Sequence, residues 1–364
     1  MNLQIPTIAA LSSAIIHEHP VGGSIFLKLG GGIRIKVKSN SPELLVRLRR
    51  YFHEFITGGG TTDILIRAIE TPPPEFPFPY TVKESDPGKT KIKEEYIDLI
   101  DGRIVRKRLT GMIFMFGHDT HIAVGPCVAN DNQIVNFINN RFMERMLIKD
   151  GLLAHAAGIS WNGHGMAIAG FSGTGKSTLS LRLLEEGATF ISNDRLILRK
   201  EMFELRMYGI PKHPRVNPGT LLASPRLEWI IGDDDRLAIK QLPEDELWHL
   251  EKKYDVHVHE VFGADCFRLE APLKGIVVLT WKRNQEATSI RTVDFAERRD
   301  LLEAFMKPVG LFFNTDGGEV PDFSPENYII AMKHSPVFEI SGGIDFRCAA
   351  DFIRDYLHEE PSDG

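Results

Sequence analysis

One stretch constrains this chain more than any other: residues 170–177, which read Gly-Phe-Ser-Gly-Thr-Gly-Lys-Ser. They fit G-x-x-x-x-G-K-[ST], the phosphate-binding loop (P-loop) or Walker A motif. The apolar run 165–169 before it is typical of a buried strand, and 178–186 after it has apolar residues at helical spacing. A glycine-rich turn that matches by chance is the alternative, and the strand and helix on either side argue against it.

The residue types in this loop suit a nucleoside triphosphate. Glycines let several backbone N–H groups point at a phosphate, and the N-terminus of the next helix adds partial positive charge. Lys176 is predicted to reach the β- and γ-phosphates, and the Ser177 hydroxyl to bind Mg²⁺. We therefore predict ATP and Mg²⁺ as ligands, with the nucleotide bound by Gly170, Ser172, Gly173, Thr174, Gly175, Lys176, Ser177 and Thr178.

Composition narrows the class of protein. The chain has 364 residues, enough for two domains, and its net charge of −6 does not indicate a nucleic-acid-binding protein. Its three cysteines are far apart and form no CxxC pair, which argues against a disulfide framework or a zinc site and favours the cytoplasm. No apolar run approaches the ~18 residues that a membrane span needs, and no signal peptide is recognisable, so no membrane partner is expected.

Residues 1–130 are predicted to form a smaller α+β module. Alternation of apolar and polar residues predicts a hairpin at 24–38 and a meander of strands over 96–124, and a helix is predicted at 41–56. Residues 1–20 are expected to be weakly structured or to form a short helix at 8–18. The proline-rich and charged segments between 71 and 93 are predicted to form a loop. The module shows no catalytic signature, so oligomerisation, substrate recognition and regulation stay open as its roles.

A strongly amphipathic helix is predicted at 131–149, and we place the domain boundary at its start. Residues 131–360 then form the second domain, which contains the glycine-rich loop. Within it, Asn162-Gly163 predicts a tight hairpin that leads into the loop.

A kinase also needs a group that orients the nucleophile. The strand predicted at 188–194 ends in Asn193 and Asp194, and in open α/β sheets the carboxyl ends of strands bear the chemistry. Asp194 is therefore expected close to the phosphates. The alternative is a turn aspartate that simply precedes Arg195.

From His155 to Asp194 the sequence resembles the catalytic core of the HPr kinase/phosphorylase family. The shared features are a histidine at the start of a hairpin, G-x-S-G-x-G-K-S, a helix closed by a glycine, and a strand that ends in a polar pair. The resemblance covers about forty residues and implies a P-loop fold related to that of phosphoenolpyruvate carboxykinase. It also makes self-association an open possibility, since hexamers occur in the family.

The resemblance implies a role for each matching residue. Asp194 matches the catalytic aspartate, the general base toward the acceptor hydroxyl, and His155 the histidine that supports it. Asn193 departs from the family, where an aspartate is usual; an amide can bind Mg²⁺ but cannot take a proton. The departure puts the family's reverse, phosphorolytic activity in doubt. The predicted catalytic residues are thus Asp194, His155 and Lys176, and the predicted metal ligands are Ser177 and Asn193.

Other charged segments allow two interpretations each. Lys212 and Arg215 are candidates for contact with phosphate or with an anionic acceptor, and solvated loop charges are the alternative. Lys282 and Arg283 follow a strong strand predicted at 273–281, and at its end they are candidates for contact with a nucleotide or phosphate. We expect a turn at 233–235, and His257 and His259 on one face of a strand, without an evident third metal ligand.

The sequence thus predicts an α/β protein whose second domain is an HPr-kinase-like, ATP-dependent phosphotransferase. The acceptor is a hydroxyl, on a protein serine or a small metabolite, and the sequence does not choose between the two. A nucleotide-binding regulatory module and an ATPase without a dedicated acceptor are the alternatives. The sequence also leaves open whether the donor is ATP, ADP or pyrophosphate.

Overall fold

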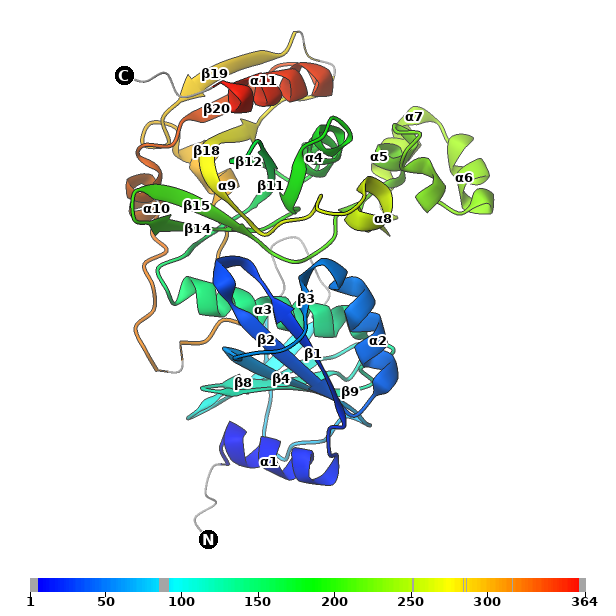
Figure 1. Cartoon of the computed structure of the whole chain (residues 1–364), viewed down its shortest axis with the longest axis vertical. Coiled ribbons are helices and arrows are strands. Elements are labelled where there is room, and N and C mark those ends of the chain that lie inside the picture. The colour runs from blue at the N-terminus through cyan, green and yellow to red at the C-terminus, as the bar shows by residue number, and fades with distance from the viewer. Residues whose placement is uncertain are drawn as a thin grey trace. The chain divides into compact units, whose positions relative to one another are not determined.

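The computed structural model describes residues 6–84, 92–250, 252–283, 285, 287–315 and 317–359. These residues form a mixed α/β protein with several sheets, divided into two compact units (Figure 1). The first unit comprises residues 1–149 and 309–321, and the second comprises 150–308 and 322–364. Most of the charged segment at 84–93 and of the C-terminal tail after 359 lies outside the described residues.

The first unit is built on a nine-stranded sheet with the order β3-β1-β2-β4-β9-β8-β7-β6-β5. The predicted hairpin pairs β1 with β2, and the predicted meander pairs β6 through β9 in sequence. The strands are β1 (Gly23–Lys28), β2 (Arg34–Ser39), β3 (Ile56–Thr57), β4 (Ile64–Glu70), β5 (Thr81–Val82), β6 (Glu94–Leu99), β7 (Gly102–Lys107), β8 (Ile113–Gly117) and β9 (Thr120–Gly125).

Helices cover both faces of this sheet. On one face, α1 (Ile8–Glu18) adds Ile8 to a cluster that includes Ile113 and Met115 of β8. On the other face, Phe114 and Phe116 of the same strand contact Phe137 of α3 (Asp131–Leu147). β8 is buried at every residue because its alternating side chains meet apolar partners on both sides. The remaining helices of this unit are α2 (Pro42–Tyr51) and the 3₁₀ turns η1 (Gly30–Gly32) and η2 (His53–Phe55).

The predicted boundary at residue 131 differs from the division seen in the structure. α3 packs against β4, β9 and α2, so it belongs to the first unit. The segment 309–321 also belongs there: the ring of Phe312 stacks on Phe116 with centroids 5.5 Å apart, and Arg103 donates to the carbonyl of Leu311. Sequence reasoning missed this return because a short irregular segment has no periodicity to reveal its partner.

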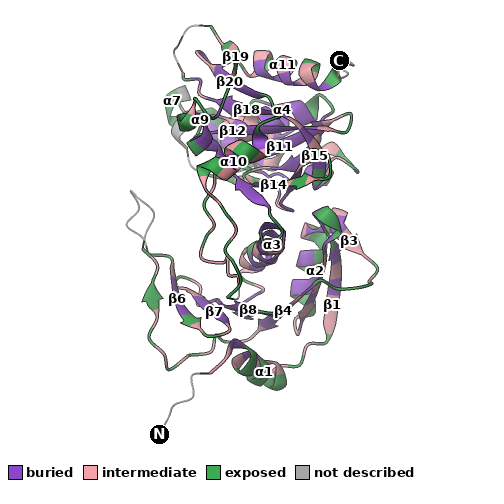
Figure 2. Ribbon diagram, turned by 90° about the vertical axis from the view of Figure 1, so that its left-hand side faces the viewer, coloured by how far each residue is buried: buried purple, intermediate pink, exposed green. Residues whose placement is uncertain are grey.

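The second unit is built on another nine-stranded sheet, whose main path is β10-β14-β15-β18-β12-β11-β13, with β20 beside β18 and β19 beside β20. Its central strands are largely buried (Figure 2). The strands are β10 (Leu152–Ala154), β11 (Ala156–Trp161), β12 (His164–Gly170), β13 (Thr189–Ser192), β14 (Leu196–Glu201), β15 (Glu204–Gly209), β18 (Glu270–Leu279), β19 (Ser289–Val293) and β20 (Val337–Ser341); β16 (Arg215–Val216) and β17 (Tyr254–Asp255) pair separately.

The pairing directions decide which strand ends meet. β12, β18 and β20 are parallel neighbours. β11 is antiparallel both to β12 and to β13, so β13 runs in the same direction as β12. The carboxyl ends of β12 and β13 therefore lie at one edge of the sheet, which is the edge where Gly170 and Asn193 leave their strands.

Helices pack around this sheet and extend beside it. α4 (Lys176–Glu185) packs against β11 and α11 (Phe346–His358), while α9 (Arg299–Phe305) adds Leu301 and Phe305 to the core cluster of the sheet; α10 (Pro325–Met332) contributes Tyr328. The region between β15 and β18 forms the short helices α5 (Pro218–Leu222), α6 (Asp233–Lys240), α7 (Glu244–His249) and α8 (Val258–Phe262), with the 3₁₀ turn η3 (Glu228–Ile230).

Two expectations for this helical region are wrong. Residues 233–235 do not form a turn; they open α6, where three carboxylates in the first turn interact favourably with the partial positive charge of the helix N-terminus. His257 and His259 do not share the face of a strand, because the chain turns into α8 at Val258.

Candidate functional site

The glycine-rich loop joins β12 to α4, as predicted. Gly170, Gly173 and Gly175 have φ values of 144°, 84° and 88°, a region that residues with side chains rarely adopt. A Cβ atom on Gly175 would lie 2.6 Å from the ring of Phe346, and one on Gly170 would lie 2.8 Å from the carbonyl oxygen of Leu279. Both the backbone geometry and the neighbouring atoms therefore require glycine at these two positions.

Two aromatic residues support the loop from outside the motif. Trp281, just past β18, donates its indole N–H to the carbonyl of Thr174 at 2.7 Å. Its ring meets Phe346, at the start of α11, edge to face with centroids 5.1 Å apart. Sequence reasoning did not assign either residue to the site, because nothing near them in the chain indicates that they meet the loop.

Lys176 folds back over its own loop. Its ammonium group donates to the carbonyls of Gly170 at 2.6 Å and Phe171 at 3.1 Å. Burial is the main cause of a pKa of about 8 for Lys176: together with the charge of Lys307, it outweighs the Asp194 carboxylate, which raises the pKa. An anion bound in the loop would favour the charged form of Lys176 and would offer it better partners than two neutral carbonyls.

Asp194 lies just beyond the end of β13, in a turn that two hydrogen bonds of the Ser192 hydroxyl stabilise. The hydroxyl of Ser192 donates to the carbonyl of Arg195 at 2.5 Å and accepts from the N–H of Ile210 at 3.2 Å. This turn places Asp194 at the sheet edge where the glycine-rich loop begins. The structure therefore brings Asp194 and Lys176 into one neighbourhood, as expected from the sequence.

His155 lies at the junction of β10 and β11, and its side chain contacts Asp194. Its Nε2 atom lies 3.1 Å from Oδ1 of Asp194. Its backbone N–H donates to the carbonyl of Phe305 at 2.6 Å, which ties the residue to the segment after α9. The predicted pair of His155 and Asp194 is thus present as a direct contact.

Two cations face the other oxygen of the carboxylate. Arg195 Nε and Lys307 Nζ each lie 3.8 Å from Oδ2 of Asp194. Partial burial raises the pKa of Asp194, but the hydrogen bond from His155 and the charges of Lys307, His155 and Arg195 outweigh it and lower the pKa to about 2. Asp194 is therefore ionised at neutral pH. Lys307 follows α9 in an irregular segment, and no sequence pattern indicated that it would lie near Asp194.

The other basic residues singled out from the sequence have different surroundings. Lys212 is close enough to Arg195 and Asp194 for their charges to act on it, and burial is the main cause of its lowered pKa. Arg215 pairs with Asp255 at 3.1 Å, and Arg283 pairs with Asp245 at 2.7 Å. Lys212 is thus linked to the Asp194 cluster, whereas Arg215 and Arg283 form ion pairs with other carboxylates.

The two predicted metal ligands suit Mg²⁺ by their chemistry. Ser177 offers a hydroxyl in the first turn of α4, and Asn193 offers an amide oxygen at the end of β13. The Oδ1 atom of Asn193 is buried and accepts no hydrogen bond from the described residues. A buried carbonyl oxygen without a donor is costly unless a cation or a bound group satisfies it, and hard oxygen ligands are those Mg²⁺ prefers.

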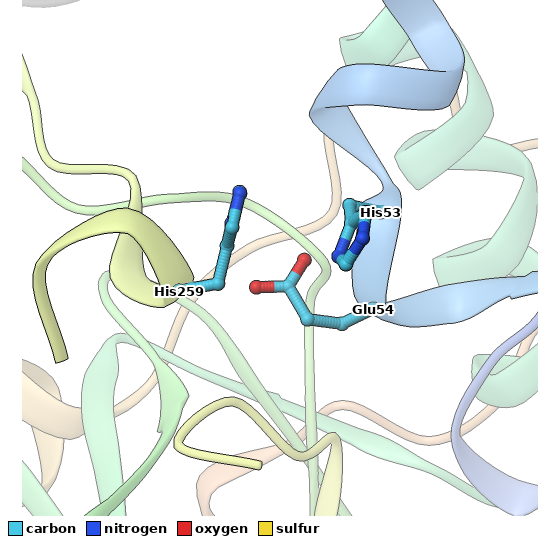
Figure 3. Close-up of side chains that lie close together, drawn as sticks. All are labelled: His53, Glu54 and His259. Atoms are coloured by element: carbon cyan, nitrogen blue, oxygen red, sulfur yellow. The ribbon is translucent and has the colours of Figure 1, made fainter. Parts of the chain in front are cut away.

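Histidines also gather outside this site. The rings of His213 and His257 lie 4.7 Å apart, and His213 accepts from the backbone N–H of Val258 at 3.4 Å. Figure 3 shows His259 on α8 of the second unit, and His53 and Glu54 on η2 of the first unit. His213 lies in the segment after β15, and the sequence did not indicate that it would lie near His257 and His259.

Comparisons with known proteins leave the family open. No protein-family model and no curated protein matches the chain. Among solved structures, the Hpr(Ser) kinase/phosphatase from Coxiella burnetii matches with a TM-score of 0.31 and 14% sequence identity, over 56% of this chain and 89% of that one. Similarity at this level does not establish a common fold or activity, so membership of the HPr kinase family stays a prediction. No helix in the described part of the chain is long and apolar enough to cross a membrane.

Proposed function

We propose that this protein is an ATP-dependent phosphotransferase that transfers the γ-phosphoryl group to a hydroxyl. The observation that carries the proposal is the contact between His155 and Asp194, 3.1 Å apart, at the sheet edge where the glycine-rich loop and Lys176 lie. A loop for phosphates alone would suit any nucleotide-binding protein. A histidine-supported carboxylate beside that loop suits a protein that also orients an acceptor.

In the proposed reaction the acceptor oxygen forms a bond to the γ-phosphorus, and the bond from that phosphorus to the β,γ-bridging oxygen breaks. The hydroxyl proton leaves toward Asp194 and then solvent, and ADP is released. Lys176 holds the β- and γ-phosphates, and the backbone N–H groups of the loop hold the rest of the phosphate chain. Mg²⁺ at Ser177 and Asn193 would neutralise phosphate charge.

The low pKa of Asp194 refines its proposed role. A carboxylate with a pKa of about 2 is a weak base, since a general base works best when its pKa is near the working pH. In a loose phosphoryl-transfer transition state the nucleophile needs little deprotonation. Asp194 would therefore act mainly by orienting the hydroxyl and by accepting its proton late, while His155 holds the carboxylate in place.

The same observation favours a second candidate. Because Asp194 is a weak base surrounded by cations, the site could hold ATP without an efficient acceptor reaction, as a regulatory module or a slow ATPase would. The two candidates differ in where the γ-phosphate goes: to a distinct acceptor, to water, or nowhere.

The test is transfer of label from γ-labelled ATP with Mg²⁺, offered to host extract that has been separated into protein and metabolite fractions. Lys176→Ala and Asp194→Asn run in parallel with the wild type. We expect one labelled protein or metabolite, lost in both variants, with ATP binding lost only in Lys176→Ala. Wild-type protein that binds ATP but labels neither fraction would reject the phosphotransferase, and labelled inorganic phosphate alone would identify an ATPase.

A further inference from the structure

Lys307 is held beside His155 by backbone pairing. The N–H of His155 donates to the carbonyl of Phe305 at 2.6 Å, and the N–H of Lys307 donates to the carbonyl of Leu153 at 3.1 Å. Ala154 and Met306 form an antiparallel bridge between these two bonds. Lys307 is thus anchored to the strand junction that positions His155, rather than placed on a free loop.

The ammonium group of Lys307 faces the proposed reaction centre. It lies 3.8 Å from Oδ2 of Asp194, and a quarter of the side chain is exposed (25%). The charge of Lys307 also lowers the pKa of Lys176, although burial is the larger cause of that lowering. Both lysines therefore interact with Asp194, and Lys307 belongs to the same charge cluster as the lysine of the loop.

The ammonium group of Lys307 does not form a close bond with Asp194. Close ammonium–carboxylate bonds are about 2.7–2.9 Å long, whereas the distance here is 3.8 Å. Arg195 lies at the same distance from the same oxygen, so the carboxylate keeps a cationic neighbour if Lys307 turns away. A phosphoryl group carries more negative charge than one carboxylate and would attract Lys307 more strongly.

We propose that Lys307 is a second lysine that binds the transferred phosphoryl group, from the side of the acceptor, while Lys176 binds it from the side of the loop. This inference rests on the proposed phosphotransferase function. One cation on each side of the phosphoryl group would stabilise the charge on its oxygens as the bond to ADP breaks and the bond to the acceptor forms. Lys307 would then touch the γ-phosphate of ATP and have no partner on ADP.

The alternative is that Lys307 only balances the charge of Asp194. The two roles differ in nucleotide preference, because a charge partner of Asp194 would not distinguish ATP from ADP. The experiment therefore compares the binding of MgATP and MgADP, by equilibrium dialysis with labelled nucleotides, with phosphoryl transfer in the same preparations. The variants are Lys307→Gln and Lys307→Arg, with Lys333→Gln, an exposed lysine of the same unit, as the matched control.

We expect Lys307→Gln to weaken ATP binding about 10-fold and to change ADP binding less than about 2-fold, because only ATP offers the γ-phosphate. Transfer should fall about 100-fold. Lys307→Arg should keep most of the ATP affinity and most of the transfer rate, and Lys333→Gln should match the wild type in both. Thermal unfolding of each variant would show that the fold is retained.

Equal weakening of ATP and ADP binding in Lys307→Gln, or an unchanged preference for ATP, would overturn the proposal. Wild-type protein that binds ATP but transfers nothing would reject the phosphotransferase, while the ATP-over-ADP comparison would still decide whether Lys307 contacts the γ-phosphate. Wild-type protein that binds neither nucleotide would overturn both the proposed function and the proposed role of Lys307.

Discussion

The Nε2 atom of His155 lies 3.1 Å from Oδ1 of Asp194, although one residue precedes the hairpin that leads into the glycine-rich loop and the other follows the helix after it. The contact exists because β11 pairs with β13, which brings the two strand ends together. In the proposed reaction, His155 would orient Asp194 and Asp194 would accept the proton of the acceptor hydroxyl.

His155→Ala is expected to lower phosphoryl transfer by about 10- to 100-fold without a change in ATP affinity, since supporting partners of a reactive group typically contribute at this level. Alanine removes the imidazole and with it the contact to Asp194. The measurement is transfer from γ-labelled ATP beside nucleotide titration, with the exposed His334→Ala as control. Transfer at the wild-type rate in His155→Ala would show that the contact has no part in the reaction.

Gly175→Ala is expected to destabilise the protein by about 2 kcal/mol or more and to lower ATP affinity at least about 10-fold. A φ of 88° costs alanine roughly 1–2 kcal/mol, and the new methyl would lie 2.6 Å from the Phe346 ring. Adding Phe346→Ala should return part of the lost stability, which a double-mutant cycle of urea unfolding would measure.

Gly163→Ala is the matched control for this pair. Gly163 has a φ of 83°, similar to that of Gly175, but a Cβ atom there would meet nothing within 4 Å. It should show the backbone cost alone, with no coupling to Phe346 and with ATP affinity retained. If Gly175→Ala and Phe346→Ala prove additive, the ring does not constrain the loop.

His121, in β9, predicts a pH-dependent stability of the first unit. Burial, aided by the charges of Arg141 and Arg145, lowers its pKa to about 3. An unfolded histidine titrates near 6.5, so the unfolded state takes up the proton first and this contribution is lost as the pH falls from about 6.5 toward 3. Relative to His121→Met, the wild type should lose about 2 kcal/mol of stability between pH 7 and pH 5. Parallel pH profiles of the two proteins would contradict the assignment.

Glu339→Gln is expected to cost about 2–4 kcal/mol of folding stability. The carboxylate is buried in β20 and accepts from Arg298 at 2.7 Å, Arg291 at 2.8 Å and Thr280 at 2.9 Å, and removing one member leaves charge without its partner. Burial raises the pKa of Glu339, but these bonds outweigh it and lower the pKa, so the stability is present above the ordinary range of a glutamate and is lost as the pH falls below it.

Chemical denaturation at pH 7 and pH 4 would measure both effects for Glu339. Glu326→Gln serves as control, because Glu326 pairs with Arg299 on the surface with 64% of its side chain exposed, and exposed pairs contribute little. A cost for Glu339→Gln as small as that of the control would mean that the buried cluster is not stabilising.

Local patterns were sufficient for most of the secondary structure. Thr7 caps α1 and Ser41 caps α2 with Pro42 at its first position, so both helices begin where short-range chemistry predicts. Errors arose where two local signals compete. Three aspartates suggested a turn at 233–235, yet they stabilise the start of α6, and the alternating histidines at 257–259 gave no warning of α8.

Some features of the candidate site were also predictable from local sequence, and others were not. The residue types and spacing of 170–177 predicted a glycine-rich loop between a strand and a helix, and the strand before Asp194 predicted a carboxylate near it, because these features depend on neighbours in the chain. Trp281, Phe346 and Lys307 were not foreseen, since each reaches the site through contacts across the sheet.

The sequence by itself therefore determined the strand–loop–helix unit, the residue types that suit a nucleotide, and most of the helices and strands of both units, because backbone propensity and periodicity act over a few residues. Only the tertiary structure decided that α3 and residues 309–321 belong to the first unit, that His155 meets Asp194, and that Lys307 joins them. Those arrangements follow from pairing between distant strands and from burial of apolar faces, whose partners no local pattern specifies.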